Sequence, residues 1–354
     1  MNVTIGNQRK TADEFHDEVM LTENRQEGTI RFWKQRKYNV RYKVNEREKS
    51  CHMKTKTIQQ VPAEPLGKNH LQMGLSAIIF TTILWGLSFV SIKITVAVIP
   101  PMTLALLRFL IASGILLFLL KKVEPSARLN RKDIPSMAVS GLLGVTAYYY
   151  FQNNGVKMTT ASAASMIIAI IPILTLIGDF LIFKTKLSLV KMLSVILSLG
   201  GVYLIVSAAP PGSQDSLIGN LFMLGSALSW VAYTLITRPL SARYTQLAVV
   251  TYQTLFGTLA LIPFVFFETW EWQLVNDLVI LHLIYLGVFC SALANYLYVY
   301  AMGELGVSRV SVFINFIPVV SVLSGLAFLH ETVSELQILG GIVILFSVYL
   351  VNRR

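Results

Sequence analysis

Two parts of the chain repeat each other, and no other feature of the sequence constrains the fold as strongly. Residues of the second half match residues of the first at a constant offset of 146, without a gap. The matched pairs include Tyr150/Tyr296, Pro172/Pro318, Ser188/Ser334 and Val202-Tyr203-Leu204/Val348-Tyr349-Leu350. Further upstream, at an offset of 145, the matched pairs are Trp85/Trp230 and Lys93/Arg238. The pattern predicts two copies of one structural unit.

Each copy contains about five apolar segments that are long enough to cross a bilayer. The ten segments are 73–93, 101–120, 134–154, 160–182, 188–207, 217–237, 246–267, 278–301, 307–329 and 335–352. An odd number of spans turns the second copy upside down relative to the first, as in many carriers that work by alternating access. We therefore predict an all-α integral membrane protein, in which ten transmembrane helices form two inverted five-helix repeats over 71–207 and 217–352.

The composition excludes an ordinary soluble domain. Mean hydropathy is +0.60, and charged residues make up 14% of the chain, whereas soluble domains carry about 25%. The sequence pI of about 9.6 could indicate nucleic-acid binding. However, outside the N-terminal tail the basic residues lie between apolar segments, where membrane orientation explains them better. We therefore expect no nucleic acid as a partner. The two cysteines, Cys51 and Cys290, are not placed to form a disulfide or a metal site, and we expect no metal or other cofactor.

The distribution of Lys and Arg predicts the orientation, because cytoplasmic loops are enriched in these residues. If the N-terminus is cytoplasmic, the opposite side receives only Lys93 and Lys157. The cytoplasmic side then holds Lys121, Lys122, Arg128, Arg131, Lys132, Lys184, Lys186, Arg238, Arg243, Arg353 and Arg354. We therefore expect a multi-pass protein of the cell membrane with both termini in the cytoplasm.

Residues 1–70 differ from the rest, since they hold nearly half of the 30 Lys and Arg residues of the chain. They mix both signs of charge and lack a sustained apolar period, which predicts a disordered cytoplasmic tail. Two other interpretations are a basic arm on anionic lipid and a contact with nucleic acid. Translation could also begin at Met53, whose Met-Lys-Thr-Lys start suits a short leader.

Polar side chains inside apolar segments are costly, so each needs a packing role or a function. The first segment holds Trp85 and Ser88, and its counterpart holds Trp230 and Tyr233. These residues predict two walls of a central cavity, although helix packing is an alternative. Arg108, in the second segment, either reaches the membrane surface or faces the bundle, where its planar fork suits a carboxylate or phosphate.

Further candidates lie in the third, eighth and ninth segments. Tyr149 and Gln152 belong to an aromatic and amide run, and Asn295 and Tyr296 belong to a similar one. Part of these runs could form an aromatic belt at the membrane surface. Asn315 is a buried amide three residues before Pro318. Pro172 and Pro318 each remove a backbone hydrogen bond and predict a kink in mid-helix. The candidate solute-binding residues are thus Trp85, Ser88, Arg108, Tyr149, Gln152, Trp230, Tyr233, Asn295, Tyr296 and Asn315.

Several motifs together resemble the EamA-type drug/metabolite transporter family. They are Trp85-Gly86-Leu87-Ser88-Phe89, Leu107-Arg108-Phe109, the mid-helix Pro172 and Pro318, and His330-Glu331-Thr332. The resemblance covers 73–352 and implies a ten-helix exporter of amino acids and related metabolites, with a cavity between the repeats. One position departs from the family pattern, because the first copy has Thr185 where the second has Glu331.

The pattern as a whole favours a secondary transporter that exports a small metabolite, such as an amino acid. No Walker A stretch is present, which argues against ATP as the energy source. A sugar-phosphate or nucleotide-sugar exchanger is the alternative if Arg108 and Lys93 both face the cavity. An intramembrane enzyme is disfavoured because the histidines lie in the tail or at segment ends, and a scaffold would not need inverted repeats. The expected partners are a small solute and the lipid bilayer, with the chain acting as a monomer or homodimer.

Overall fold

The computed structural model divides into two units, residues 1–67 and residues 68–354. It describes residues 2–5, 8–11, 20–24, 29–33, 41–46, 56–61, 68–183, 188–207, 216–241, 243–270, 272–305, 310 and 313–352. The charged residues Lys184, Lys186 and Arg309, the departing position Thr185 and the whole connection 208–215 therefore lie outside the described residues.

The first unit contains a sheet whose strands follow the order β2-β1-β6-β5-β4-β3. Its strands are β1 (Asn2–Ile5), β2 (Gln8–Thr11), β3 (Met20–Asn24), β4 (Thr29–Trp33), β5 (Arg41–Glu46) and β6 (Lys56–Val61). β5 and β6 pair antiparallel from Arg41 opposite Val61 to Glu46 opposite Lys56. The disordered tail that the charge pattern predicts for residues 1–70 stays a prediction. Segments such as Thr29–Trp33 are rich in β-branched and aromatic residues, a local preference that the charge pattern does not reveal.

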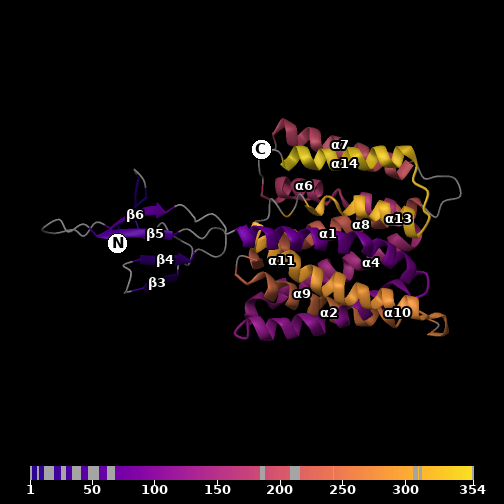
Figure 1. Ribbon diagram of the computed structural model, residues 1–354, viewed down its shortest axis with the longest axis horizontal. Helices are drawn as coiled ribbons and strands as arrows, with labels where there is room; N and C mark the ends of the chain where they lie inside the picture. The colour runs from indigo at the N-terminus through magenta and orange to yellow at the C-terminus, as the bar shows by residue number, and fades with distance from the viewer. Residues whose placement is uncertain are drawn as a thin grey trace. The chain divides into compact units, whose positions relative to one another are not determined.

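The second unit is a bundle of helices (Figure 1). Its first half contains α1 (Lys68–Val96), α2 (Pro101–Val123), η2 (Arg131–Asp133), α3 (Ile134–Gly141), η3 (Leu142–Ala147), α4 (Tyr148–Met158), α5 (Ala161–Ile168), α6 (Ile171–Phe183) and α7 (Leu189–Ser207). Its second half contains α8 (Leu217–Ser241), α9 (Gln246–Val265), η4 (Trp272–Leu274), α10 (Asp277–Ile284), η5 (Tyr285–Leu293), α11 (Ala294–Leu305), α13 (Ile317–Phe328) and α14 (Glu335–Asn352). The described part of this unit is helical, as the sequence predicts.

Among the described residues, seven helices are long and apolar enough to cross a membrane. They span 71–96, 101–123, 161–178, 189–207, 217–241, 246–265 and 277–301. Two shorter apolar helices cover 317–328 and 335–350. The expected third span is the helical stretch 134–158, whose polar run of Tyr, Gln and Asn lowers its apolar character. The full count of ten spans therefore stays a prediction.

The helices that correspond to each other in the two halves are interrupted at the same places. α5 and α6 are separated by a turn at 169–170, and α13 is preceded by a turn at 315–316. These turns lie just before Pro172 and Pro318, which cannot donate to the carbonyls of Ile168 and Ile314. The kinks expected from the two prolines are thus breaks in the helix. The π-helical stretches η3 and η5 are a second shared irregularity, of a kind that is frequent at functional sites.

Helices α2 and α9 pack antiparallel, and each begins where the other ends. Glu268, just after α9, accepts hydrogen bonds from the Met102 N–H (2.9 Å) and the Thr103 N–H (2.7 Å) at the start of α2. At the opposite end, Glu124 follows α2 and accepts a hydrogen bond from Thr245, the N-cap of α9. A carboxylate therefore stabilises the positive N-terminal end of α2, where its backbone N–H groups lack helical partners.

Candidate functional site

A cavity of about 200 Å³ lies within the helical bundle and is lined by both halves of the chain. Its polar and aromatic lining consists of Trp85, Ser88, Phe89, Arg108, Phe109, Tyr148, Tyr149, Gln152, Ser165, Trp230, Tyr233, Gln253, Thr254, Asn295 and Asn315. The interrupted helices contribute Ile168 and Pro172 from one half and Ile314 and Pro318 from the other. Irregular backbone beside a cavity is the arrangement by which many carriers form their binding sites.

Nine of the ten residues that the sequence singles out line this cavity. The exception is Tyr296, which packs instead against the apolar cluster that contains Met102, Ala105 and Phe109. One residue along a helix turns the side chain by about 100°, and in α11 this turn takes Tyr296 out of the cavity that Asn295 lines. The structure thus brings together nine candidates from distant parts of the chain, and their role in binding a solute is proposed below.

Aromatic side chains form a continuous wall on one side of the cavity. Tyr149 contacts Tyr148 with ring centroids 4.9 Å apart, and Tyr148 contacts Trp230 at 5.0 Å. Trp230 in turn contacts Tyr233 at 5.0 Å. Sequence reasoning did not single out Tyr148, because three consecutive tyrosines on one helix give no indication of which of them face inward. This wall offers large apolar faces to a solute.

Trp85 lies in α1 and is fixed by a single hydrogen bond. Its Nε1 donates to the backbone carbonyl of Cys290 at 3.0 Å, and its ring lies 5.4 Å from the ring of Tyr298. The Cys290 carbonyl belongs to η5, one of the two π-helical stretches, where the backbone departs from the α-helical pattern. The irregular backbone of the second half therefore positions an aromatic residue of the first.

Arg108 is the charged residue among the described residues that line the cavity, and it is only 2% exposed. Its Nε donates to Ser291 Oγ at 3.0 Å, and its guanidinium carbon lies 4.7 Å from the centre of the Tyr149 ring. Its Nη1 has no hydrogen-bond partner. The side chain therefore faces the bundle rather than reaching the membrane surface, which decides between the two interpretations that the sequence allows.

Gln152 is a second cavity residue with unused hydrogen-bonding capacity. It is 5% exposed, and its Nε2 donates to the Tyr148 hydroxyl at 3.0 Å. Its Oε1 has no partner. Buried polar groups in native proteins are nearly always hydrogen-bonded. An orphaned acceptor and an orphaned donor that line one cavity therefore indicate a polar ligand.

Gln253 occupies the position in the second half that Arg108 occupies in the first, and its polar atoms are engaged. Its Nε2 donates to Ser140 Oγ at 2.9 Å and to Thr237 Oγ1 at 2.9 Å. Its Oε1 accepts a hydrogen bond from the Tyr233 hydroxyl at 3.0 Å. The two halves are therefore asymmetric at this position: Gln253 joins helices together, whereas Arg108 retains an unpaired donor.

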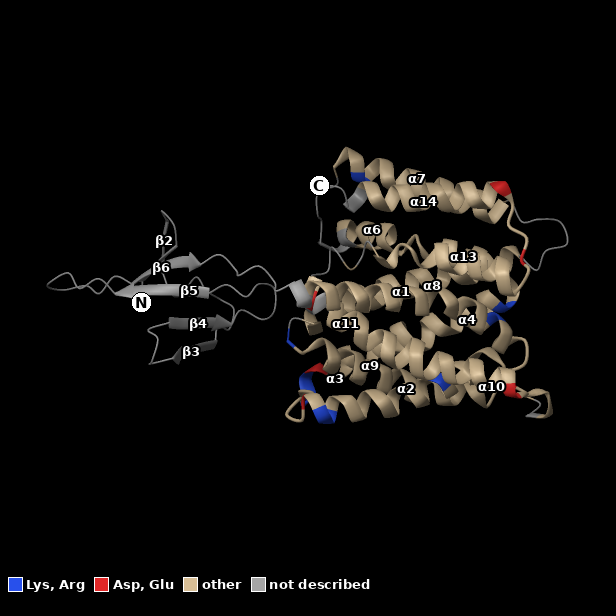
Figure 2. Ribbon diagram, viewed as in Figure 1, with Lys and Arg blue, Asp and Glu red and all other residues tan. Residues whose placement is uncertain are grey.

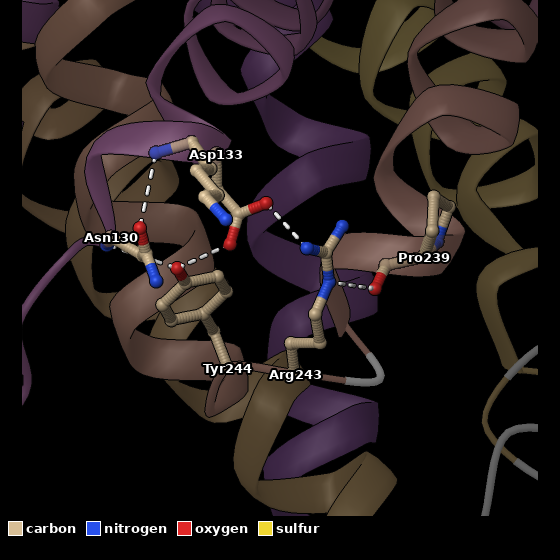
Figure 3. Close-up of polar contacts among 6 residues, drawn as sticks. Asn130, Asp133, Pro239, Arg243 and Tyr244 are labelled. Carbon is tan, nitrogen blue, oxygen red and sulfur yellow. Dashed lines mark hydrogen bonds and ion pairs between the residues drawn. The ribbon is translucent and has the colours of Figure 1, made fainter. Parts of the chain in front are cut away.

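A second polar cluster lies at the end of the bundle where α2 ends and α9 begins (Figure 3). Asp133 forms an ion pair of 2.5 Å with Arg243 and accepts a hydrogen bond of 2.6 Å from the Tyr244 hydroxyl. The same hydroxyl accepts a hydrogen bond from the Asn130 N–H at 3.0 Å. Burial and the bond to Asp133 raise the pKa of Tyr244, so the phenol stays protonated. These contacts of Asp133, in the first half, with Arg243 and Tyr244, in the second, link the two halves.

Among the described residues, no group of three or more His, Cys, Asp or Glu side chains is placed to hold a metal ion. His282 donates to or accepts from Ser91 Oγ at 3.0 Å, and neither residue lines the cavity described above. The described lining of the cavity offers aromatic faces, amides, hydroxyls and the Arg108 guanidinium to a ligand.

Comparison with known proteins places both halves in one family. The model of the EamA-like transporter family matches residues 72–207 and again residues 217–353. An uncharacterized transporter of Archaeoglobus fulgidus is 28% identical over 77% of this chain and 96% of its own length. The uncharacterized transporter YvbV of Bacillus subtilis is 29% identical over 78% of this chain and 90% of its own.

A relative with a more specific name comes from Streptantibioticus cattleyicolor. This protein, named "probable terminal-alkyne amino-acid exporter", is 25% identical over 80% of this chain and 95% of its own length. A solved crystal structure aligns with a TM-score of 0.57 at 18% identity, over 81% of this chain and 99% of that one. At that identity the alignment shows a shared fold alone.

Proposed function

Since this chain belongs to the EamA-like transporter family and is a membrane transporter, we propose that it exports a small metabolite, such as an amino acid, by alternating access. The solute binds in the central cavity while two inverted five-helix repeats rock around it. The observation that carries this proposal is the cavity itself, which both halves line at their interrupted helices.

The antiparallel packing of α2 and α9 supports the inverted arrangement. These helices hold equivalent places in the two halves, and Glu268 and Glu124 join their opposite ends. An inverted repeat gives the cavity two equivalent ways out, one on each side of the membrane. Alternating access then needs only an exchange between two similar conformations.

The charge distribution supports a cell-membrane location with both termini in the cytoplasm. Figure 2 shows that the described Lys, Arg, Asp and Glu residues gather mainly near the two ends of the bundle, which leaves a largely uncharged belt between them. The end that holds Lys121, Lys122 and Arg243 is the cytoplasmic one under the positive-inside rule. Thr332 and the start of α5 then face the outside.

The name of the Streptantibioticus cattleyicolor relative supports an amino acid as the solute. The size of the cavity agrees with a molecule of that kind, because about 200 Å³ is small among ligand sites. Its lining combines aromatic faces with a few polar groups, which suits an amphipathic solute better than a highly charged one.

The sugar-phosphate alternative requires both Arg108 and Lys93 in the cavity. Lys93 does not line it. Its Nζ donates to the backbone carbonyls of Val156 (3.0 Å) and Thr159 (2.6 Å) at the C-terminal end of α4. There the ammonium stabilises the negative end of the helix. A single guanidinium is a weak match for a phosphate that carries nearly two charges.

Everted membrane vesicles test the proposal, since an exporter accumulates solute in their interior. Vesicles that contain the chain should take up labelled amino acids faster than matched vesicles without it, and a protonophore should abolish any accumulation driven by a proton gradient. Equal uptake by both preparations across a panel of amino acids would contradict amino-acid export. Chemical conversion of a solute without its movement would favour an enzyme.

A further inference from the structure

We infer that Arg108 and Gln152 form the subsite that holds the charged head group of an apolar α-amino acid, with Arg108 binding the carboxylate and Gln152 accepting from the ammonium. This inference rests on the proposed function and names its solute class. It concerns residues of the first half only, because the equivalent position of Arg108 in the second half is the fully engaged Gln253.

The first argument is the charge of Arg108. A buried guanidinium without a carboxylate is costly, because a charge taken out of water must be compensated. Arg243, by contrast, forms an ion pair with the Asp133 carboxylate. Among the described residues, the recorded contacts of the Arg108 guanidinium are with Ser291 Oγ and with the rings of Phe109 and Tyr149, none of which is an anion. An anionic ligand supplies the missing charge.

The second argument is the geometry of the guanidinium. Nε is already used by Ser291, while Nη1 has no partner. Arginine binds carboxylates through parallel N–H donors in a fixed fork. The Ser291 contact and the Tyr149 ring hold the plane of the fork in place, so little side-chain entropy is lost when a carboxylate binds. Arg108 is therefore organised as a carboxylate receptor before the solute arrives.

The third argument is the position of Gln152 relative to Arg108. Tyr149 lies against the Arg108 guanidinium, Tyr148 contacts Tyr149, and the Tyr148 hydroxyl accepts from Gln152 Nε2. Because Nε2 is the bound donor, the amide is oriented with Oε1 as its unused acceptor. A neutral acceptor and a cationic donor that line one cavity match the ammonium and carboxylate of a zwitterion.

The fourth argument concerns the remainder of the solute. Beyond the head-group subsite, the aromatic wall continues from Tyr148 to Trp230 and Tyr233. Among the described residues, no carboxylate or second cation lines the cavity, so an acidic or basic side chain would have no partner there. The site thus favours amino acids with aromatic or aliphatic side chains.

Binding to the purified full-length chain tests this inference without any transport. The probes are L-phenylalanine, phenethylamine (which lacks the carboxylate) and 3-phenylpropionate (which lacks the ammonium). Affinity is measured by the change in tryptophan fluorescence, since Trp85 and Trp230 line the cavity. We expect L-phenylalanine to bind at least tenfold more tightly than phenethylamine, because a hydrogen bond to a charged group contributes that much or more. Equal affinities, or no binding of either, would overturn the assignment.

Variants locate the effect. Arg108→Gln should reduce the affinity for L-phenylalanine at least tenfold while leaving phenethylamine unchanged, and Gln152→Leu should weaken phenethylamine but not 3-phenylpropionate. Arg108→Lys keeps the charge but loses the fork, and serves as the variant that retains the fold. Ser198→Ala is the control, because Ser198 Oγ is also a buried orphan but does not line the cavity. If Arg108→Gln lowers the affinities for L-phenylalanine and phenethylamine equally, Arg108 does not bind the carboxylate.

Thermal unfolding without ligand separates a binding role from a structural one. An unpaired buried charge destabilises the empty protein, so Arg108→Gln should raise the unfolding midpoint or leave it unchanged. A structural arginine would lower it on substitution. The outcomes also separate this inference from the proposed function. Arg108-dependent binding of L-phenylalanine without uptake into vesicles would contradict export alone, whereas uptake that does not discriminate against phenethylamine would contradict the head-group subsite alone.

Discussion

Ser113 Oγ and Thr258 Oγ1 lie 3.0 Å apart and form a buried hydrogen bond between α2 and α9. The two residues are separated by 145 positions, which is also the offset that relates Trp85 to Trp230. Each is therefore the repeat equivalent of the other. Two equivalent residues can touch only where a local two-fold axis passes between them, so this contact marks the axis that relates the two halves.

A disulfide at this axis should form when both residues become cysteine. We expect Ser113→Cys with Thr258→Cys to cross-link under mild oxidation, because short, facing side chains meet the distance requirement of a disulfide. After protease cleavage in the connection 208–215, the two halves should stay joined on a non-reducing gel and separate on reduction. Either single cysteine is the control. Separation of the halves without reductant would place the axis elsewhere.

The Glu331 carboxylate stabilises the start of α5 in the other half. It accepts from the Ala161 N–H at 2.6 Å, the Ser162 N–H at 3.0 Å and Ser162 Oγ at 2.6 Å. Glu331→Gln replaces one acceptor oxygen by a donor and removes the negative charge from a helix N-terminus. We expect a loss of about 1–3 kcal/mol of stability, seen as a lower midpoint of thermal unfolding.

Glu268→Gln should behave in the same way, since Glu268 makes the same set of contacts with Met102 and Thr103. The control is Glu335→Gln, because Glu335 lies exposed in the first turn of α14 and should change the midpoint little. Equal midpoints for all three variants would show that the carboxylates do not support these helix starts.

The repeat made much of this structure predictable. Offsets of 145 and 146 relate Trp85 to Trp230 and Pro172 to Pro318, and both pairs line one cavity. The prediction succeeds because a repeated fold places equivalent residues around a shared axis. Residue types that occur at equivalent positions in both halves are therefore expected to lie close together in space. The offset also identified Gln253 as the partner position of Arg108.

Other features could not be predicted from the sequence. Glu268 has an apolar repeat equivalent, Val123, so no pattern singles it out, and its contacts bridge residues that lie 165 or more positions apart. Tyr296 is expected at the cavity because it belongs to an aromatic run beside Asn295, but a run of alternating aromatic and aliphatic residues does not reveal which face is buried. Arg108 could face either way, since apolar residues surround α2 on every side.

Close packing of α7 against α14 gives a matched pair of glycine substitutions. These two helices lie side by side in Figure 1. A Cβ atom at Gly201 would lie 2.7 Å from the Gly340 carbonyl oxygen, whereas a Cβ atom at Gly200 meets nothing within 4 Å. We expect Gly201→Ala to lower the unfolding midpoint through a cost of about 1–3 kcal/mol.

Gly200→Ala should leave the midpoint unchanged or raise it, because alanine is the better helix former. Gly340→Ala should match Gly201→Ala, since its Cβ atom would lie 2.6 Å from the Gly201 carbonyl oxygen. Identical midpoints for the Gly200 and Gly201 variants would mean that α7 and α14 do not approach as closely as described.

The proposed orientation predicts which turns a membrane-impermeant maleimide can reach. Ser126, between α2 and η2, and Thr332, between α13 and α14, are both exposed. The test uses a chain that carries Cys51→Ser, in which the buried Cys290 should not react with the maleimide added to either side of the membrane. We expect Thr332→Cys to be labelled in intact cells and Ser126→Cys only after permeabilisation, because Lys121, Lys122 and Arg131 hold the latter turn in the cytoplasm. The bundle places Glu331 beside the start of α5 and Glu124 beside the start of α9, and in the proposed orientation these two helix starts lie on opposite sides of the membrane. Labelling of both cysteines from one side would therefore contradict the proposed topology.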